Sequence, residues 1–222
     1  MTQLNWSDPP SQTAFPVAKA GYPFIFASAF ATAVFALLGV GFLAMLGLLA
    51  TGFICWFFRD PDRLVPVGEG VIVSPADGKV VKIEPVAETP YYPGACTRVS
   101  VFMSIFNVHV NRSPHEGTVR RVNYYPGKFF SANLDKASAE NEHNALLLEG
   151  PDGKQVGFVQ IAGLVARRII CRVQEGDSLG RGQRFGMICF GSRLDVYLPV
   201  NAEIKVTVGD RVQAGTTILG KW

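Results

Sequence analysis

One pattern occurs twice near the C-terminus, as VQEGDSLGRGQRF at residues 173–185 and as VTVGDRVQAGTTI at residues 206–218. In both copies a valine is followed by a Gly-Asp pair and then by apolar residues at matching positions. Glycine tolerates a positive φ and aspartate hydrogen-bonds its own backbone, so each Gly-Asp pair predicts a tight turn. The apolar residues that flank the two turns are then expected to face one shared core.

The chain after residue 63 consists of short apolar runs separated by Gly, Pro and Asp. Runs of this kind, rich in Val, Ile and Phe, are typical of strands. A short helix is expected over residues 134–141. We therefore predict a β-dominated domain with strands over residues 71–73, 78–83, 97–103, 117–122, 145–148, 156–161, 169–173, 185–190, 194–198 and 203–208.

The duplicated pattern resembles the hammerhead turn of biotinyl- and lipoyl-like β-sandwich domains. Val73-x-Pro75-x-x-Gly78-x-Val80 resembles the opening strand of the same fold. This resemblance implies a duplicated hybrid β-sandwich, but it says little about function, because one scaffold hosts many activities. A membrane-anchored, lipoyl-like binding module without catalysis stays an alternative. Such a module needs a modifiable lysine at the hairpin tip, and residues 174–204 contain none.

The composition is more apolar than that of a typical soluble protein. Of the 222 residues, 48% are hydrophobic and 18% are charged, against about 25% charged in an average soluble domain. This composition excludes disorder. The net charge of +3 is too small to indicate nucleic-acid binding. Residues 20–58 contain no Asp, Glu, Lys, Arg or His, so the excess hydrophobicity is concentrated there.

The uncharged stretch predicts attachment to a membrane. One span needs about 20 apolar residues, so residues 23–58 are too long for one span and suffice for two short ones. A reversal at residues 39–41 would give a helical hairpin; one long tilted helix or a buried core hairpin remain alternatives. A cleaved signal peptide fits poorly, because its apolar region is shorter. Lys19, Arg59 and Arg63 flank the stretch and favour the cytoplasmic face. We expect an N-terminal tail at 1–19, an anchor at 20–58 and a β-domain at 59–222.

The cysteines and histidines show no metal-binding pattern. Cys55, Cys96, Cys171 and Cys189 have no CxxC spacing, and four buried reduced thiols are the expected state. The three histidines form neither HxH nor HExxH, so no metal is expected. A zinc endopeptidase of the lysostaphin type, which shares the Gly-Asp turn, is disfavoured for the same reason.

Three residues that are far apart in the sequence could form a catalytic group. Asp77 lies in a turn before a strand, His109 has apolar neighbours, and Ser192 follows Gly191 after an apolar run. A carboxylate, an imidazole and a hydroxyl can act as a triad if the fold brings them together. The alternatives are an aspartate that closes a turn, a histidine packed in the core and a serine in a strand.

Several ordered motifs in residues 59–222 resemble the short form of the phosphatidylserine decarboxylase proenzyme family. They are FGSRLD at 190–195, VHVNRxPxxG at 108–117, SPADGK at 74–79 and the region of Asn141 and Glu142. The apolar N-terminal anchor also fits that family. Because the motifs are separate and occur in the family's order, the resemblance covers nearly the whole β-domain.

The resemblance implies a self-processing enzyme. The chain would cut itself between Gly191 and Ser192 into residues 1–191 and 192–222, which stay together as a heterodimer; further dimerisation is left open. Ser192 would become a covalent pyruvoyl group, the cofactor, which forms a Schiff base with the amine of phosphatidylserine. His109 would act as the base and Asp77 would orient it. The products are phosphatidylethanolamine and CO₂ in phospholipid biosynthesis.

Because the implied substrate is a lipid, the active site is expected to face the headgroups, and the flanking positive charges favour the cytoplasmic face of the cell membrane. Longer members carry a second histidine where this chain has Phe106, so His109 is the candidate proton donor in decarboxylation and His115 a weaker one. Phe129 and Phe130 are expected either in a loop that enters the interface or in the core. Arginines that could attract anionic headgroups, or simply be solvated, are Arg112, Arg120, Arg121, Arg167 and Arg168.

Overall fold

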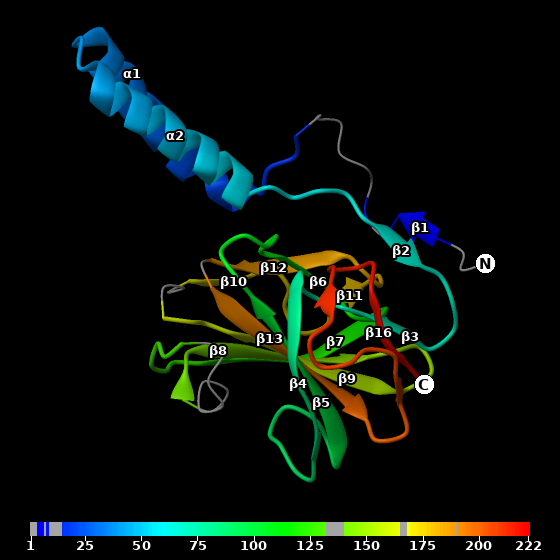
Figure 1. The fold of residues 1–222 in the computed structure, drawn as a ribbon. Coiled ribbons are helices and arrows are strands. Elements are labelled where there is room, and N and C mark those ends of the chain that lie inside the picture. The colour runs from blue at the N-terminus through cyan, green and yellow to red at the C-terminus, as the bar shows by residue number, and fades with distance from the viewer. Residues whose placement is uncertain (1–3, 7, 9–14, 132–139, 165–167, 190) are drawn as a thin grey trace. The chain divides into compact units, whose positions relative to one another are not determined.

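The computed structural model describes the whole chain except residues 1–3, 7, 9–14, 132–139, 165–167 and 190 (Figure 1). The chain divides into two units. One contains residues 10–62, and the other contains residues 1–9 and 63–222. Each unit is described by itself.

The smaller unit contains a short 3-10 helix (Lys19–Gly21) and two apolar helices, α1 (Tyr22–Leu37) and α2 (Gly41–Phe57) (Figure 1). The two helices pack closely at Gly47, where an added Cβ would lie 2.5 Å from Oγ1 of Thr32. The hydroxyls of Ser28 and Thr51 are 2.7 Å apart between the helices. Small and hydroxylated residues at such a contact allow close packing of apolar helices. The helical segment Lys19–Leu37 is long and apolar enough to cross a membrane, and α2 is shorter.

The described elements of the larger unit are strands, as the sequence predicts. In chain order they are β1 (Leu4–Trp6), β2 (Leu64–Pro66), β3 (Val71–Val73), β4 (Gly78–Val86), β5 (Cys96–Met103), β6 (Val110–Arg112), β7 (Gly117–Tyr125), β8 (His143–Glu149), β9 (Gln155–Ile161), β10 (Ile169–Cys171), β11 (Ser178–Leu179), β12 (Arg184–Ile188), β13 (Ser192–Pro199), β14 (Glu203–Ile204), β15 (Arg211–Val212) and β16 (Ile218–Lys221).

The strands form one large sheet and three small ones. The large sheet has eight strands in the order β11-β7-β8-β9-β13-β5-β4-β15. Two small sheets have the orders β10-β12-β6 and β14-β16-β3, and β1 pairs with β2. The main core lies on one face of the large sheet; its largest buried side chains include Phe158, Phe185 and Leu194. These sheets confirm the prediction of a β-dominated domain.

The sheet orders reveal an internal duplication. We call β6–β12 the continuous half, and β3–β5 together with β13–β16 the split half. Each half contributes four strands to the large sheet and three to a small sheet, in corresponding order. The backbone repeats the correspondence: Val80 N–H donates to Asp210 O at 2.9 Å, and Val119 N–H donates to Asp177 O at 2.8 Å. The two Gly-Asp turns of the sequence repeat are therefore equivalent parts of two halves.

The halves also exchange hydrogen bonds with each other. Arg112 N–H donates to Pro75 O, and Val73 N–H donates to Pro114 O, both at 2.9 Å. These reciprocal bonds join the segment before β4 to β6 and the segment before β7 to β3. They place the residues around Asp77 against the strand that follows His109.

Some sequence predictions differ from the structure. The strand predicted over 203–208 ends at Ile204, and most of the helix predicted over 134–141 lies outside the described residues. The prediction of four buried thiols is wrong for Cys55 and Cys171, which are only partly buried although all four thiols are free. Cys171 ends β10, an edge strand, and therefore lacks a neighbour on one side.

Candidate active site

Ser192 begins β13 and is fully buried. Side chains alternate along a strand, so Ser192 points to the same face as Leu194, toward the main core. Its hydroxyl oxygen has no hydrogen-bond partner among the residues that the structure describes. A buried polar group without a partner costs about 1–3 kcal/mol. Such a group is a candidate for a chemical role.

Gly191 precedes this serine with φ of +60°, in the left-handed region that favours glycine. A Cβ at this position would meet no atom of the described residues within 4 Å, so conformation and not space favours glycine here. Phe190 lies outside the described residues. Burial raises the pKa of the nearby Cys189 thiol, which keeps that thiol protonated and makes it a poor competing nucleophile.

Asp77 lies immediately before β4, and its side chain is 11% exposed. Its carboxylate accepts a hydrogen bond from Arg63 Nη2 at 2.8 Å and another from Ala214 N–H at 2.8 Å. An added Cβ at Gly78 would lie 2.2 Å from Phe102 O, so glycine is needed for this close approach to the end of β5. Asp77 is therefore fixed beside that strand end.

His109 lies immediately before β6 and is fully buried. Its carbonyl oxygen accepts a hydrogen bond from Ile188 N–H at 3.3 Å. Two residues further on, Asn111 Nδ2 approaches Met103 Sδ at 3.7 Å. His109 therefore directly precedes a strand, β6, that contacts the end of β5.

The three candidate residues lie on segments that border the C-terminal end of β5. Ser192 is the register partner of Met103, and β4 and β13 flank β5 on its two sides. The start of β4 carries Asp77, and β6 joins His109 to the same strand end. The topology thus brings the backbone segments of Asp77, His109 and Ser192, from three distant parts of the sequence, to one strand end.

A chain of buried amides fixes this region from within. Gln160 Nε2 donates to Asn111 Oδ1 at 2.9 Å, and Asn144 Nδ2 donates to Gln160 Oε1 at 3.2 Å. All three side chains are buried. A connected buried network of this kind holds its members rigidly. It ties β6, and with it His109, to β8 and β9.

A hollow of about 530 Å³ opens beside Asp77; we call it the Asp77 pocket. Its lining combines one acid, two cations, polar side chains and Phe106. The full set is Asp77, Gly78, Lys79, Phe102, Ser104, Phe106, Asn107, Arg211, Val212 and Gln213.

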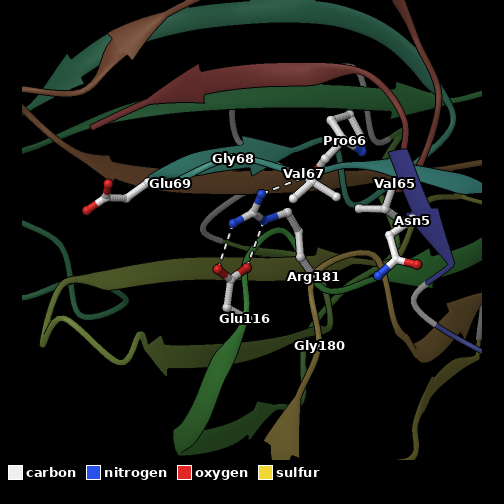
Figure 2. A pocket seen from close by; sticks show the side chains of 9 residues that line it. All are labelled: Asn5, Val65, Pro66, Val67, Gly68, Glu69, Glu116, Gly180 and Arg181. Atoms are coloured by element: carbon white, nitrogen blue, oxygen red, sulfur yellow. Dashed lines mark hydrogen bonds and ion pairs between the residues drawn. The ribbon is translucent and has the colours of Figure 1, made fainter. Parts of the chain in front are cut away.

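A second hollow of about 540 Å³, which we call the Glu116 pocket, lies at the equivalent place in the continuous half and is completed by β1 and β2 (Figure 2). Its one cation pairs with one of its two acids, because Arg181 donates to both carboxylate oxygens of Glu116 at 2.7 and 2.6 Å. Arg181 Nη1 also donates to Pro66 O at 3.1 Å. The cation in this hollow is therefore already matched.

Sequence reasoning missed several of these residues and misplaced one. Neither Arg63 as the partner of Asp77 nor the amide chain was predicted. Arg112 was expected either to attract headgroups or to be solvated, but it is 3% exposed and donates to Gly182 O at 2.9 Å, so both expectations are wrong for this residue. Phe129 and Phe130 are both partly buried. A visible signal was the likeness of SPADG at 74–78 to SPHEG at 113–117, which marks the two halves.

Comparison with known proteins finds relatives that match most of the chain. The family model described as phosphatidylserine decarboxylase matches residues 50–220. A phosphatidylserine decarboxylase proenzyme from Syntrophus aciditrophicus is 53% identical over 92% of this chain and 96% of its own length. Proteins of the same name from Nitratidesulfovibrio vulgaris and Nitrosomonas europaea are 52% and 49% identical, over 90% and 93% of this chain and 92% and 95% of their own.

The name shared by these relatives defines a class, that of decarboxylases made as proenzymes. Within that class, the chain belongs to the phosphatidylserine decarboxylase family. Family membership favours an enzyme over the alternative of a binding module without catalysis.

Proposed function

We propose that this chain cuts itself between Gly191 and Ser192 and then decarboxylates phosphatidylserine to phosphatidylethanolamine and CO₂. The observation that carries the proposal is the junction itself. A glycine in the left-handed region precedes a buried serine hydroxyl that has no hydrogen-bond partner among the described residues. Membership of the family supplies the reaction and the substrate.

Self-cleavage uses only residues of the chain. His109 takes the proton of Ser192 Oγ, and the oxygen attacks the carbonyl carbon of Gly191. The Gly191–Ser192 amide becomes an ester, from which elimination releases the Gly191 carboxylate and leaves dehydroalanine at position 192. Hydrolysis then gives a pyruvoyl group and ammonia. Asp77, held by Arg63 and Ala214, orients His109 and stabilises its protonated form.

Position 192 suits a pyruvoyl group, because the Ser192 hydroxyl, which leaves with the Gly191 carboxylate in the elimination, is buried and has no hydrogen-bond partner among the described residues that its departure would break. When formed, the group supplies a carbonyl that binds the substrate amine and withdraws electrons as the carboxylate leaves as CO₂. The buried segment around Ser192 excludes water, and His109 is the candidate group for returning a proton to the product.

Three further statements belong to the same proposal. The two chains stay together as a heterodimer after cleavage. The β-domain is a duplicated hybrid of the biotinyl- and lipoyl-like type, which the two equivalent halves support. Residues 20–58 anchor the enzyme at the cytoplasmic face of the cell membrane. Exposed apolar side chains such as Phe26 and Leu37, 71% and 88% exposed, support such an anchor.

The test is intact-mass measurement of purified full-length protein. The wild type should give two chains, with the chain from 192 lighter by one ammonia than the same peptide with an N-terminal serine. Ser192→Ala should stay one chain of 24.1 kDa and show no decarboxylase activity. Ser100→Ala is the matched control, because Ser100 is also buried with a hydroxyl that lacks a partner among the described residues. Cleavage of Ser192→Ala, or its loss in both variants, would contradict the proposed junction.

A further inference from the structure

The Asp77 pocket contains two cations that no acid neutralises. Lys79 on β4 and Arg211 on β15 are direct register partners, and both are exposed. Neither makes an ion pair or a side-chain hydrogen bond with any residue that the structure describes. Like charges directly opposite each other destabilise a sheet. The pair therefore lowers stability unless an anion binds between the two side chains.

The duplicated fold shows that the scaffold does not need these charges. The equivalent positions in the continuous half are Thr118 on β7 and Ser178 on β11, which are register partners in the same way. The turns beside them make the same backbone hydrogen bonds, because Gly209 N–H donates to Val80 O and Gly176 N–H donates to Val119 O, both at 2.8 Å. The cations are thus a property of one pocket and not of the turn.

Apolar side chains lie next to the cations. Phe106 lines the same pocket and is 63% exposed, and Ile105 beside it is 38% exposed. Ser104 and Asn107 close this turn through hydrogen bonds of 2.9 and 2.8 Å to Asn107 Oδ1. Exposed apolar side chains beside unmatched cations suit a ligand with an anionic group followed by an apolar part.

We propose that the Asp77 pocket binds the phosphodiester of the lipid substrate, with Lys79 and Arg211 as its cationic contacts and Phe106 beside the glycerol and the first methylene groups. The inference rests on the proposed function and adds the residues that recognise the substrate's phosphate. Hydrogen bonds from Lys and Arg to phosphate oxygens are charge-assisted and strong. Asp77 does not repel the anion strongly, because Arg63 lies 2.8 Å from its carboxylate.

The experiment uses full-length protein in detergent and a short-chain phosphatidylserine, dihexanoyl, below its micelle concentration. Loss of two charge-assisted contacts in Lys79→Gln/Arg211→Gln should raise KM at least about tenfold and change kcat by less than about threefold. Lys221→Gln/Arg172→Gln removes the same two charges outside the pocket and should leave KM within about twofold. An unchanged KM in the pocket variant, or an equal rise in both variants, overturns the proposal.

Two further arms identify the source of the phosphate. Glycerophosphoserine should compete with substrate in the wild type and not in the pocket variant. Inorganic phosphate that competes equally well would assign a free-phosphate site and overturn the headgroup assignment. A KM effect seen only on phosphatidylserine vesicles would overturn it too, because it would show general attraction to an anionic surface.

Folding of each variant is checked by its thermal unfolding and by its extent of self-cleavage. If the double variant does not fold, Lys79→Gln and Arg211→Gln are compared singly with Lys221→Gln and Arg172→Gln, with the same expected directions. A failure of the proposed function is distinguishable, because the wild type would then remain one chain and KM could not be measured at all.

Discussion

The split half and the continuous half share one backbone plan but differ in chemistry. Asp77 and Glu116 occupy equivalent positions before β4 and β7. Both acids pair with an arginine from elsewhere in the chain, but Asp77 accepts one hydrogen bond from Arg63, whereas both carboxylate oxygens of Glu116 accept hydrogen bonds from Arg181. The same turn therefore occurs twice with different side-chain chemistry, and the proposed function assigns a catalytic role to one copy only.

The largest effect on self-cleavage is expected from replacing His109, the proposed base. His109→Ala should slow self-cleavage on the order of 10²–10⁴-fold, because the serine loses its base. His115→Ala changes a second buried histidine, which packs 4.8 Å from Trp222 beside the Glu116 pocket, and should cleave at a rate near wild type. The measurement is the appearance of the small chain with time after synthesis. Equal slowing in both variants would count against His109 as the base.

The two equivalent acids offer a sharper comparison. Asp77→Asn should slow cleavage by roughly 10- to 100-fold, because the neutral side chain cannot stabilise protonated His109. Glu116→Gln should leave cleavage within about twofold and lower the free energy of unfolding by about 1–3 kcal/mol, because Arg181 loses its partner. The same time course and urea unfolding of the Ser192→Ala precursor distinguish the two. Normal cleavage of Asp77→Asn would remove Asp77 from the site.

Replacing Arg63 and Arg181, the arginine partners of these two acids, should also affect self-cleavage differently, but the difference should be smaller. Arg63→Gln should slow cleavage several-fold, by roughly 0.5–1.5 kcal/mol of activation, because Asp77 loses a positioning hydrogen bond. Rescue by Arg63→Lys is expected, since one hydrogen bond and the charge are restored. Arg181→Gln should affect stability without affecting cleavage. A cleavage defect in Arg181→Gln that matched Arg63→Gln would show that the halves are not chemically distinct.

The smallest expected effect is a pH dependence of stability that arises from His115 in the continuous half. Burial lowers the pKa of His115 below its ordinary value. The histidine therefore binds a proton more readily in the unfolded chain, so its neutral form contributes stability above the unfolded pKa, about 6.5, and that contribution is lost as pH falls below it. The urea midpoint of the Ser192→Ala precursor should decrease as the pH is lowered from 7.5 to 5.5. The decrease should be smaller in the double variant Ser192→Ala/His115→Gln. An equal fall would exclude His115 as a cause.

The strands of the larger unit could be predicted because each carries its own local signal. Short runs of Val, Ile and Phe gave β5, β9 and β13 to within a few residues. The strand β6, Val110–Arg112, was not predicted, because it is short and two of its three residues are polar. Its strand character comes from pairing with β12, which no local pattern encodes.

The candidate site was predictable only in part. Asp77, His109 and Ser192 were singled out by residue type and were given roles by the family resemblance, but the position of their segments around Met103 depends on pairings between distant strands that no local pattern encodes. Arg63, Lys79 and Arg211 were not recognised, because a charge in a strand or loop looks solvated until its neighbours are known. The pairing of β4 with β15 gives two of these charges a common location.

The position of β13 has a consequence for the life of the protein. This strand lies between β9 and β5 in the middle of the large sheet, and it begins at Ser192. A cut before Ser192 would leave four strands of the split half on a separate short chain, held only by pairing and packing. The chain must then fold before it is cut. If a cut molecule unfolds, its two chains are no longer covalently linked, and the short chain would have to find its place in the sheet as a separate molecule. Its durability would be set by the rate of unfolding and not by an equilibrium.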